Sequence, residues 1–132
     1  LMDDIYSTLG DTGGNLYIAN GNEGDAIEKV GIDFLKEQIR KRKEANIIQH
    51  ILVSKDDKNL IPPLDKYRIF PDQYFSPHPF VIYGSKLALQ CKQNPQKTII
   101  INDERFAEAA KGLFKFIWDR TEMPSYENSK KA

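Results

Sequence analysis

The β-rich segment NIIQHILV, residues 46–53, most limits the folds open to this chain. Its dense run of β-branched and apolar residues is typical of a strand buried on both faces. A second strand is predicted at residues 15–20, NLYIAN, which are bounded by turn residues. Between them, residues 25–43 repeat apolar side chains at three- and four-residue spacing, which predicts one amphipathic helix capped by Asp25. This order predicts a right-handed βαβ unit with two parallel strands.

The middle of the chain predicts an antiparallel hairpin at residues 80–90. The apolar segments FVIY and KLALQ flank Gly84 and Ser85, and a two-residue loop with glycine first is typical of a type II′ turn. The preceding YRIF, residues 67–70, predicts a short strand that ends at Pro71.

The last third of the sequence predicts one more strand, a long helix and a tail. The strand is expected at residues 97–101, and Asn102 or Asp103 then caps a helix whose apolar face is wide enough to cover a sheet and a partner. Residues 122–132 have the composition of a flexible tail. We therefore expect an α/β fold, with a single mixed β-sheet flanked by helices and a central antiparallel hairpin.

Composition narrows the class of protein. The 132 residues suffice for one domain with a real core, and 40% hydrophobic with 29% charged residues is typical of a globular protein. Nineteen basic residues balance nineteen acidic ones, so the chain alone has no excess charge to offer nucleic acid. The basic run RKRK at residues 40–43 is interpreted as a solvated helix end.

Cysteine usage and hydropathy predict the compartment. The single cysteine, Cys91, excludes an internal disulfide and fits a reducing environment. No signal-peptide pattern is present, and no apolar run approaches the roughly 20 residues that a membrane span needs. We expect a cytoplasmic protein with no membrane partner. Because the sequence begins at Leu1, we also expect it to be a fragment of a longer protein.

The segment that begins at His78 resembles a catalytic motif. In the phospholipase D superfamily the signature is H-x-K-x4-D, in which the histidine attacks phosphorus and the lysine neutralises charge on the phosphoryl oxygens. This sequence has Phe80 and Ser85 at the lysine and aspartate positions. Because an apolar phenyl ring cannot stabilise a phosphoryl anion, we expect no enzymatic activity. A residual phosphodiesterase is the alternative.

The order of motifs over residues 15–120 resembles the phospholipase D-like regulatory domain of TrmB-type transcriptional regulators. The shared pattern is an arginine before a proline turn, an aromatic-Gly-small-Lys hairpin, a strand ending in Asn with an acid, and a helix finishing in Phe and Trp. The matching residues are Arg68, Pro71, Tyr83, Gly84, Lys86, Asn102, Glu104, Phe114 and Trp118. The resemblance implies a catalytically degenerate effector domain.

The same resemblance implies an organisation for the chain. Residues 1–10 would be the end of a linker or dimerisation helix, 11–121 the regulatory domain, and 122–132 the flexible tail. Such a domain forms homodimers and relays a small-molecule signal to an N-terminal winged-helix domain that contacts DNA, which this chain lacks. A ligand-free docking or dimerisation module is a further alternative.

Asn20, Asn22 and Glu23 are the first candidates for binding an effector, either a sugar or a phosphorylated metabolite. They lie after the first strand and before a helix, where backbone amides and the helix N-terminus can hold an anion or sugar hydroxyls. A plain polar loop is the alternative, because a few glycines without a phosphate-loop signature are weak evidence.

Arg68, His78 and Tyr83 are candidates to face the vestigial catalytic pocket; the alternatives are an arginine bound to a carboxylate and a histidine that caps a strand. Phe114 and Trp118, on the edge of the final helix, are the candidate homodimer interface. No cofactor or metal site is predicted.

Overall fold

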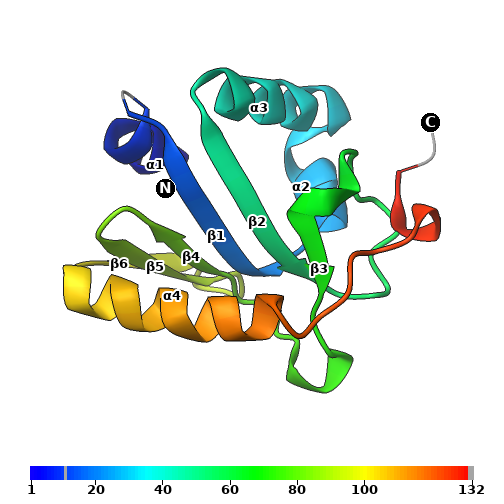
Figure 1. Cartoon of the computed structure of the whole chain (residues 1–132). Helices are drawn as coiled ribbons and strands as arrows, with labels where there is room; N and C mark the ends of the chain where they lie inside the picture. Colours follow the sequence, from blue (N-terminus) through cyan, green and yellow to red (C-terminus); the bar gives the residue numbers. More distant parts are fainter. Residues whose placement is uncertain (11, 131–132) are drawn as a thin grey trace.

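The computed structural model describes residues 1–10 and 12–130. Its core is one mixed sheet of six strands in the order β3-β2-β1-β4-β5-β6, with α1, α2 and α3 on one face and α4 on the other (Figure 1). The strands are β1 Gly14–Gly21, β2 Ile47–Val53, β3 Tyr67–Ile69, β4 Phe80–Tyr83, β5 Lys86–Cys91 and β6 Lys97–Asn102. The helices are α1 Met2–Leu9, α2 Glu23–Val30, α3 Ile32–Glu44 and α4 Glu104–Trp118. The predicted α/β fold class is confirmed.

The central strand β1 joins the parallel and antiparallel halves of the sheet. It pairs in parallel with β2, where Leu16 lies opposite Gln49, and antiparallel with β4, where Leu16 lies opposite Tyr83. The predicted parallel βαβ unit and the hairpin are both confirmed, and Gly84 has the positive φ of 59° that its turn requires.

Successive side chains of each strand point to opposite faces of the sheet, so the core has two layers. Leu16 packs with α1 on one face, whereas Tyr17 packs with Phe114 of α4 on the other. A third cluster, around Leu60 and Tyr67, fills the end of the sheet near β3.

The helix predicted over residues 25–43 is two helices, and its predicted cap is wrong. Gly31 breaks the helix with φ 85° and ψ 154°, a backbone conformation that side chains with a Cβ rarely adopt. Asn22 is the residue that caps α2, because its side-chain oxygen accepts a hydrogen bond from the Asp25 backbone N–H at 2.8 Å. Asp25 therefore lies inside α2.

Burial of β2 on both faces holds only for its second half. Residues Ile51, Leu52 and Val53 are buried, but the Ile48 side chain is 59% exposed. The short strand β3 pairs with β2 only at Ile51–Val53, so the outer edge of the first half of β2 is open. The sequence pattern does not reveal how short the neighbouring strand is.

The segment predicted to be a flexible tail contacts the domain over residues 122–130. Glu122 O accepts a hydrogen bond from Ile69 N at 2.8 Å, and Leu60 exchanges backbone hydrogen bonds with Asn128 and Lys130. The buried amide of Asn128 also donates to the Lys55 and Asp57 carbonyls at 2.7 and 3.0 Å. The last two predicted tail residues, and position 11 at the predicted domain boundary, lie outside the described residues.

The final helix begins as predicted, with Asp103 accepting a hydrogen bond from the Arg105 N–H at 2.9 Å. Within the described part of the chain, no helix combines the length and the apolar character that crossing a membrane requires.

Candidate functional site

Three of the predicted ligand residues, Asn20, Asn22 and Glu23, line a groove of about 410 Å³ between the sheet and helices α1, α2 and α3. We call it the helix-side groove. Its floor and walls are apolar, and polar side chains gather at its rim, which is a usual composition for a small-molecule site. The apolar lining includes Leu16, Ile18, Ile51 and Val81 from the sheet and Ala26, Val30, Phe34 and Leu35 from the helices.

The Asn20 amide holds the rim of this groove in place. Asn20 has a left-handed backbone, with φ 60°, and its side chain is buried. Its Nδ2 donates to the His78 carbonyl and its Oδ1 accepts from the Ser76 N–H, both at 3.1 Å. The side chain thus fastens the loop before β4 to the end of β1. It is a positioning residue with its hydrogen-bonding groups already engaged.

Glu23 is buried under the β1–α2 loop rather than directed at solvent. Its carboxylate accepts a hydrogen bond from Tyr67 Oη at 2.7 Å, and its backbone N–H donates to Asp57 Oδ2 at 2.9 Å. Burial raises the pKa of this carboxyl, although the hydrogen bond from Tyr67 works in the opposite direction. Glu23 and the capping Asn22 therefore shape the loop.

The side chains free to meet a ligand at the rim differ from the three predicted from the sequence. Asp25 and Lys29 form an ion pair at 3.6 Å on α2, and Lys92 faces them from the end of β5. Burial lowers the pKa of Lys92, and the nearby Lys29 lowers it further. Phe34 offers a half-exposed aromatic ring. Asp25 and Lys29 are four residues apart on α2, but no local signal joins them to Phe34 or Lys92, which reach the rim through the packing of α3 and the sheet.

A buried arginine closes the inner end of the groove. Arg42 Nη1 donates to Gln49 Oε1 at 2.7 Å, while its buried Nε has no hydrogen-bond partner among residues 1–10 and 12–130. Beside it, Tyr6 of α1 donates to Gln38 Oε1 at 2.9 Å. The first residues of α1 also line the groove, which therefore touches both the β1–α2 loop and α1.

The other three predicted ligand residues lie in different places. Tyr83 is fully buried, and its Oη donates to Asp4 Oδ2 at 2.7 Å. The ring of His78 accepts a hydrogen bond at Nδ1 from the Lys92 N–H at 3.1 Å. Arg68 lies over the ring of Trp118, 4.5 Å from its centroid. The six residues therefore do not form one pocket.

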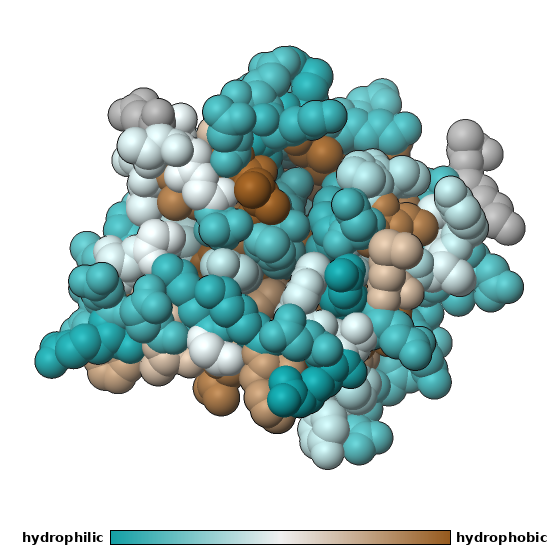
Figure 2. All heavy atoms as spheres, in the orientation of Figure 1, coloured by the Kyte–Doolittle hydropathy of each residue, from teal (hydrophilic) through white to brown (hydrophobic). Residues whose placement is uncertain are grey.

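Phe114 belongs to the core and not to a free surface. It is 4% exposed, and its ring contacts Tyr17 at a centroid separation of 5.2 Å. Trp118 is partly buried between Phe114 and Arg68. The large exposed apolar residues of α4 are instead Phe106, Leu113 and Phe116. Figure 2 shows hydrophobic residues gathered along the margin of the molecule at α4.

His50 stacks on Tyr17 at 4.8 Å between ring centroids, and its Nε2–H donates a hydrogen bond to Asn15 Oδ1 at 3.1 Å. Burial lowers its pKa, and Lys115 and Arg68 lower it further. His50 thus sits in an aromatic cluster on the α4 face of the sheet.

Comparison with protein-family models and with curated proteins finds no match to this chain. The fold is similar to that of TrmBL2. That protein has a solved structure described as an archaeal chromatin protein with a novel mode of DNA binding. The TM-score is 0.58 at 16% sequence identity, and the likeness covers 92% of this chain and 50% of TrmBL2. The chain thus spans about half the length of that protein, and the TrmB-type resemblance is supported at the level of the fold.

Proposed function

We propose that this chain is the effector domain of a TrmB-like transcriptional regulator, which binds a small polyhydroxylated metabolite such as a sugar in the helix-side groove. One observation carries the proposal: α1 and the β1–α2 loop line the same groove. A ligand there contacts both the predicted binding loop and the helix expected to lead toward a DNA-binding domain. The fold likeness to TrmBL2 agrees with this role.

The chemistry of the groove suits a sugar. Asp25, Lys29 and Lys92 supply acceptors and donors at the rim, and the Phe34 ring offers a flat apolar surface for the C–H face of a pyranose. The apolar floor beneath them excludes water from part of the ligand. Asp25 and Lys29 pair with each other, which leaves Lys92 as a donor for a sugar hydroxyl.

Signal relay follows from how α1 is held. Asp4 binds Tyr83 and Lys86 of the hairpin, while Tyr6 binds Gln38 of α3. A ligand that contacts Leu1, Met2 or Ile5 more closely in one position of α1 shifts the helix toward that position. The ligand binds the domain with different affinity in the two positions of α1. This difference in affinity sets the coupling free energy that can reach a DNA-binding domain.

The domain acts without catalysis in this proposal. The His78 ring is bound by a backbone N–H, and Phe80 and Ser85 replace the lysine and aspartate of the phosphodiesterase signature. Hydrolysis of bis-p-nitrophenyl phosphate by the parent and His78→Ala should be equal and negligible. A parent rate that depends on His78 would favour the residual phosphodiesterase instead.

Homodimerisation is the second part of the proposal, and we place it at α4 and β6. Among the strands that the structure describes, the edge strand β6 pairs only with β5, and Ile99 and Ile100 on it are exposed. Ile99 lies on the α4 face of the sheet, the same face as the exposed Phe106, Leu113 and Phe116 of α4. Ile100, opposite Ala88, lies on the other face, so apolar side chains flank the edge on both sides. An edge strand that faces its own copy antiparallel satisfies its backbone groups in a symmetric, self-complementary contact. A second copy of this chain is therefore the occupant.

The test of the effector role is a calorimetric and thermal-shift screen of neutral mono- and disaccharides. A sugar that binds the native groove should raise the melting temperature, because ligand binding to the folded state alone stabilises it. Phe34→Ala and Lys92→Ala should abolish the shift, whereas Lys36→Ala, an exposed α3 residue outside the groove lining, should retain it. An unchanged shift in both groove variants would overturn the assignment.

A further inference from the structure

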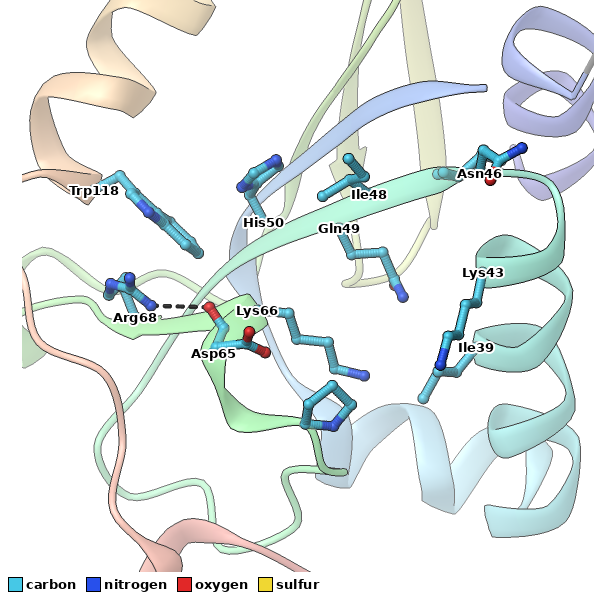
Figure 3. A pocket seen from close by; sticks show the side chains of 12 residues that line it. Ile39, Lys43, Asn46, Ile48, Gln49, His50, Asp65, Lys66, Arg68 and Trp118 are labelled. Carbon is cyan, nitrogen blue, oxygen red and sulfur yellow. Dashed lines mark hydrogen bonds between the residues drawn. The ribbon is translucent and has the colours of Figure 1, made fainter. Parts of the chain in front are cut away.

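A second cavity, of about 590 Å³, lies at the open edge of β2. We call it the β2-edge pocket. It is bounded by α3, the first half of β2, the turn Leu64–Lys66 and the side chains of Arg68 and Trp118 (Figure 3). It shares none of its lining residues with the helix-side groove.

Lys66 is the most unusual group in this pocket. It is 9% exposed, and its buried Nζ has no hydrogen-bond partner in the part of the chain that the structure describes. In Figure 3 the side chain extends toward α3, in the space between Gln49 and Lys43. Its ammonium lies 5.2 Å from the Tyr67 ring centroid. Burying a cation without hydrogen bonds costs free energy. An anion beside Lys66 would accept its hydrogen bonds and offset that cost, which favours anion binding here.

Two more cations line the pocket without an acidic partner. Neither Lys43 nor Arg68 has a carboxylate within 4 Å among the described residues, and Asp65 is the one acidic residue in the lining. Arg68 Nη1 donates to the Asp65 and Tyr67 carbonyls at 2.9 and 2.8 Å, and its guanidinium stacks on Trp118. These contacts fix the orientation of the guanidinium and leave its other N–H groups available.

The open edge of β2 adds backbone donors to the pocket. Asn46 O accepts from Gly14 N on the β1 side, and Val53 O accepts from Phe70 N on the β3 side. Because successive residues of a parallel strand direct their backbone groups to opposite neighbours, the N–H groups of Ile47 and Gln49 face the β3 side. There β3 pairs only with Ile51–Val53 and does not cover them.

We propose that the β2-edge pocket binds an oxyanion, the phosphate group of a phosphorylated small molecule, through Lys43, Lys66 and Arg68. The exposed Ile48 side chain, His50 and the edge of Trp118 provide the surface for the rest of the ligand. This site is separate from the sugar site proposed above, so it supplies a second input to the same domain. An extended peptide paired to the β2 edge is the competing occupant, and it needs no phosphate.

The single tryptophan of the sequence makes this proposal directly measurable, since Trp118 lines the pocket. Inorganic phosphate, titrated at constant ionic strength against chloride, should change the Trp118 fluorescence saturably. Lys66→Met should weaken the apparent affinity by roughly tenfold or more, as expected when a hydrogen bond between charged groups is lost. Lys66→Arg should retain binding. Lys41→Gln, on the same helix as Lys43 but outside the lining, should match the parent.

The pH dependence provides an independent readout. Burial lowers the pKa of Lys66 to about 8; the nearby Glu23 and Asp65 oppose this shift, and Arg42 adds to it. Raising the pH from 8 to 10 should therefore weaken phosphate binding by the parent, because inorganic phosphate stays a dianion while Lys66 loses its proton. Lys66→Arg should bind with little change over that range.

Three outcomes would overturn the proposal: no saturable response to phosphate, an equal response to chloride, or unchanged affinity in Lys66→Met with native circular dichroism. None of them bears on the sugar site, whose readout depends on Phe34 and Lys92. Loss of the sugar response would likewise leave the phosphate titration unaffected.

Discussion

Tyr83 Oη donates a hydrogen bond of 2.7 Å to Asp4 Oδ2, joining the hairpin to α1 across 79 residues of sequence. Lys86 Nζ strengthens the connection, since it lies 3.1 Å from both Asp4 oxygens and 3.1 Å from Thr8 Oγ1. The hydrogen bond from Tyr83 and the nearby Lys86 hold the pKa of Asp4 below its ordinary value. The Asp4 carboxylate therefore helps hold α1 against the sheet.

Asp4→Ala should lower the free energy of unfolding by about 1–3 kcal/mol, because the buried Tyr83 hydroxyl loses its acceptor. Asp4→Asn should cost less, since its amide oxygen can still accept that hydrogen bond. Urea unfolding of Asp4→Ala, Tyr83→Phe and the double variant measures the coupling between the two residues. Additive losses in the double variant would show that the contact contributes nothing in solution.

Acid should weaken the same contact. The native pKa of Asp4 is lowered, so the unfolded chain binds the proton more tightly than the folded one. The stabilising contribution is complete above the unfolded pKa, near 3.8, and is lost as the pH falls below it. Asp4→Asn should therefore lose less stability than the parent between pH 5 and pH 3 in urea unfolding. Parallel losses in the two proteins would contradict this linkage.

Gly31→Ala should destabilise the domain by about 1 kcal/mol or more, because the break between α2 and α3 requires φ 85°. Apart from its chain neighbours, no atom of residues 1–10 and 12–130 lies within 4 Å of a Cβ at this position, so the cost is conformational and not steric. Gly112→Ala, in the exposed middle of α4 and also without a close neighbour, is the matched control. It should stabilise by about 0.5–1 kcal/mol, as alanine does in a helix interior. Stabilisation by both substitutions would contradict the assigned role of Gly31.

The difference between these two glycines also shows what the sequence could predict. Apolar periodicity located the strands and α4, because burial of one face leaves a regular trace in the sequence. It could not show that α2 and α3 are separate, since Gly31 interrupts the backbone without interrupting the apolar spacing. The pattern of GS between two β-rich segments predicted the hairpin because the turn itself demands a glycine.

The residues of the candidate sites were also only partly predictable, because a sequence pattern shows local features and not how distant elements pack. The residues predicted at the β1–α2 loop line a groove, because strand ends and helix starts meet there. Phe34, Lys92 and Lys66 were missed, since their positions depend on how distant elements pack. Tyr83 was selected for a pocket and lies buried against Asp4 of α1, a partner that no local pattern identifies.

Asn128→Ala should destabilise the domain by about 1–3 kcal/mol, although it lies in the segment expected to be a tail. Its buried Nδ2 satisfies the carbonyls of Lys55 and Asp57, which lose that donor on truncation. Tyr126→Ala, in the same turn but 84% exposed, should change stability by at most about 0.5 kcal/mol. Thermal unfolding of the two variants tests the contact, and equal melting temperatures would show that the turn is not held there.

Exposed residues of α4 should control self-association, and buried ones should control folding. Leu113→Glu, at a position 71% exposed, should convert a homodimer to a monomer in sedimentation equilibrium with little change in unfolding free energy. Phe114→Ala should instead cost about 3–5 kcal/mol of stability, because it empties core volume beside Tyr17. Thr98→Pro would extend the test to the edge strand. Thr98 lies opposite Gln90, whose N–H donates to Pro79 on the β4 side, so the Thr98 N–H points away from β5 and proline there blocks pairing with a second copy. A parent that is monomeric at micromolar concentration would exclude the dimer altogether, and a dimer that persists in Leu113→Glu would place the interface on another face.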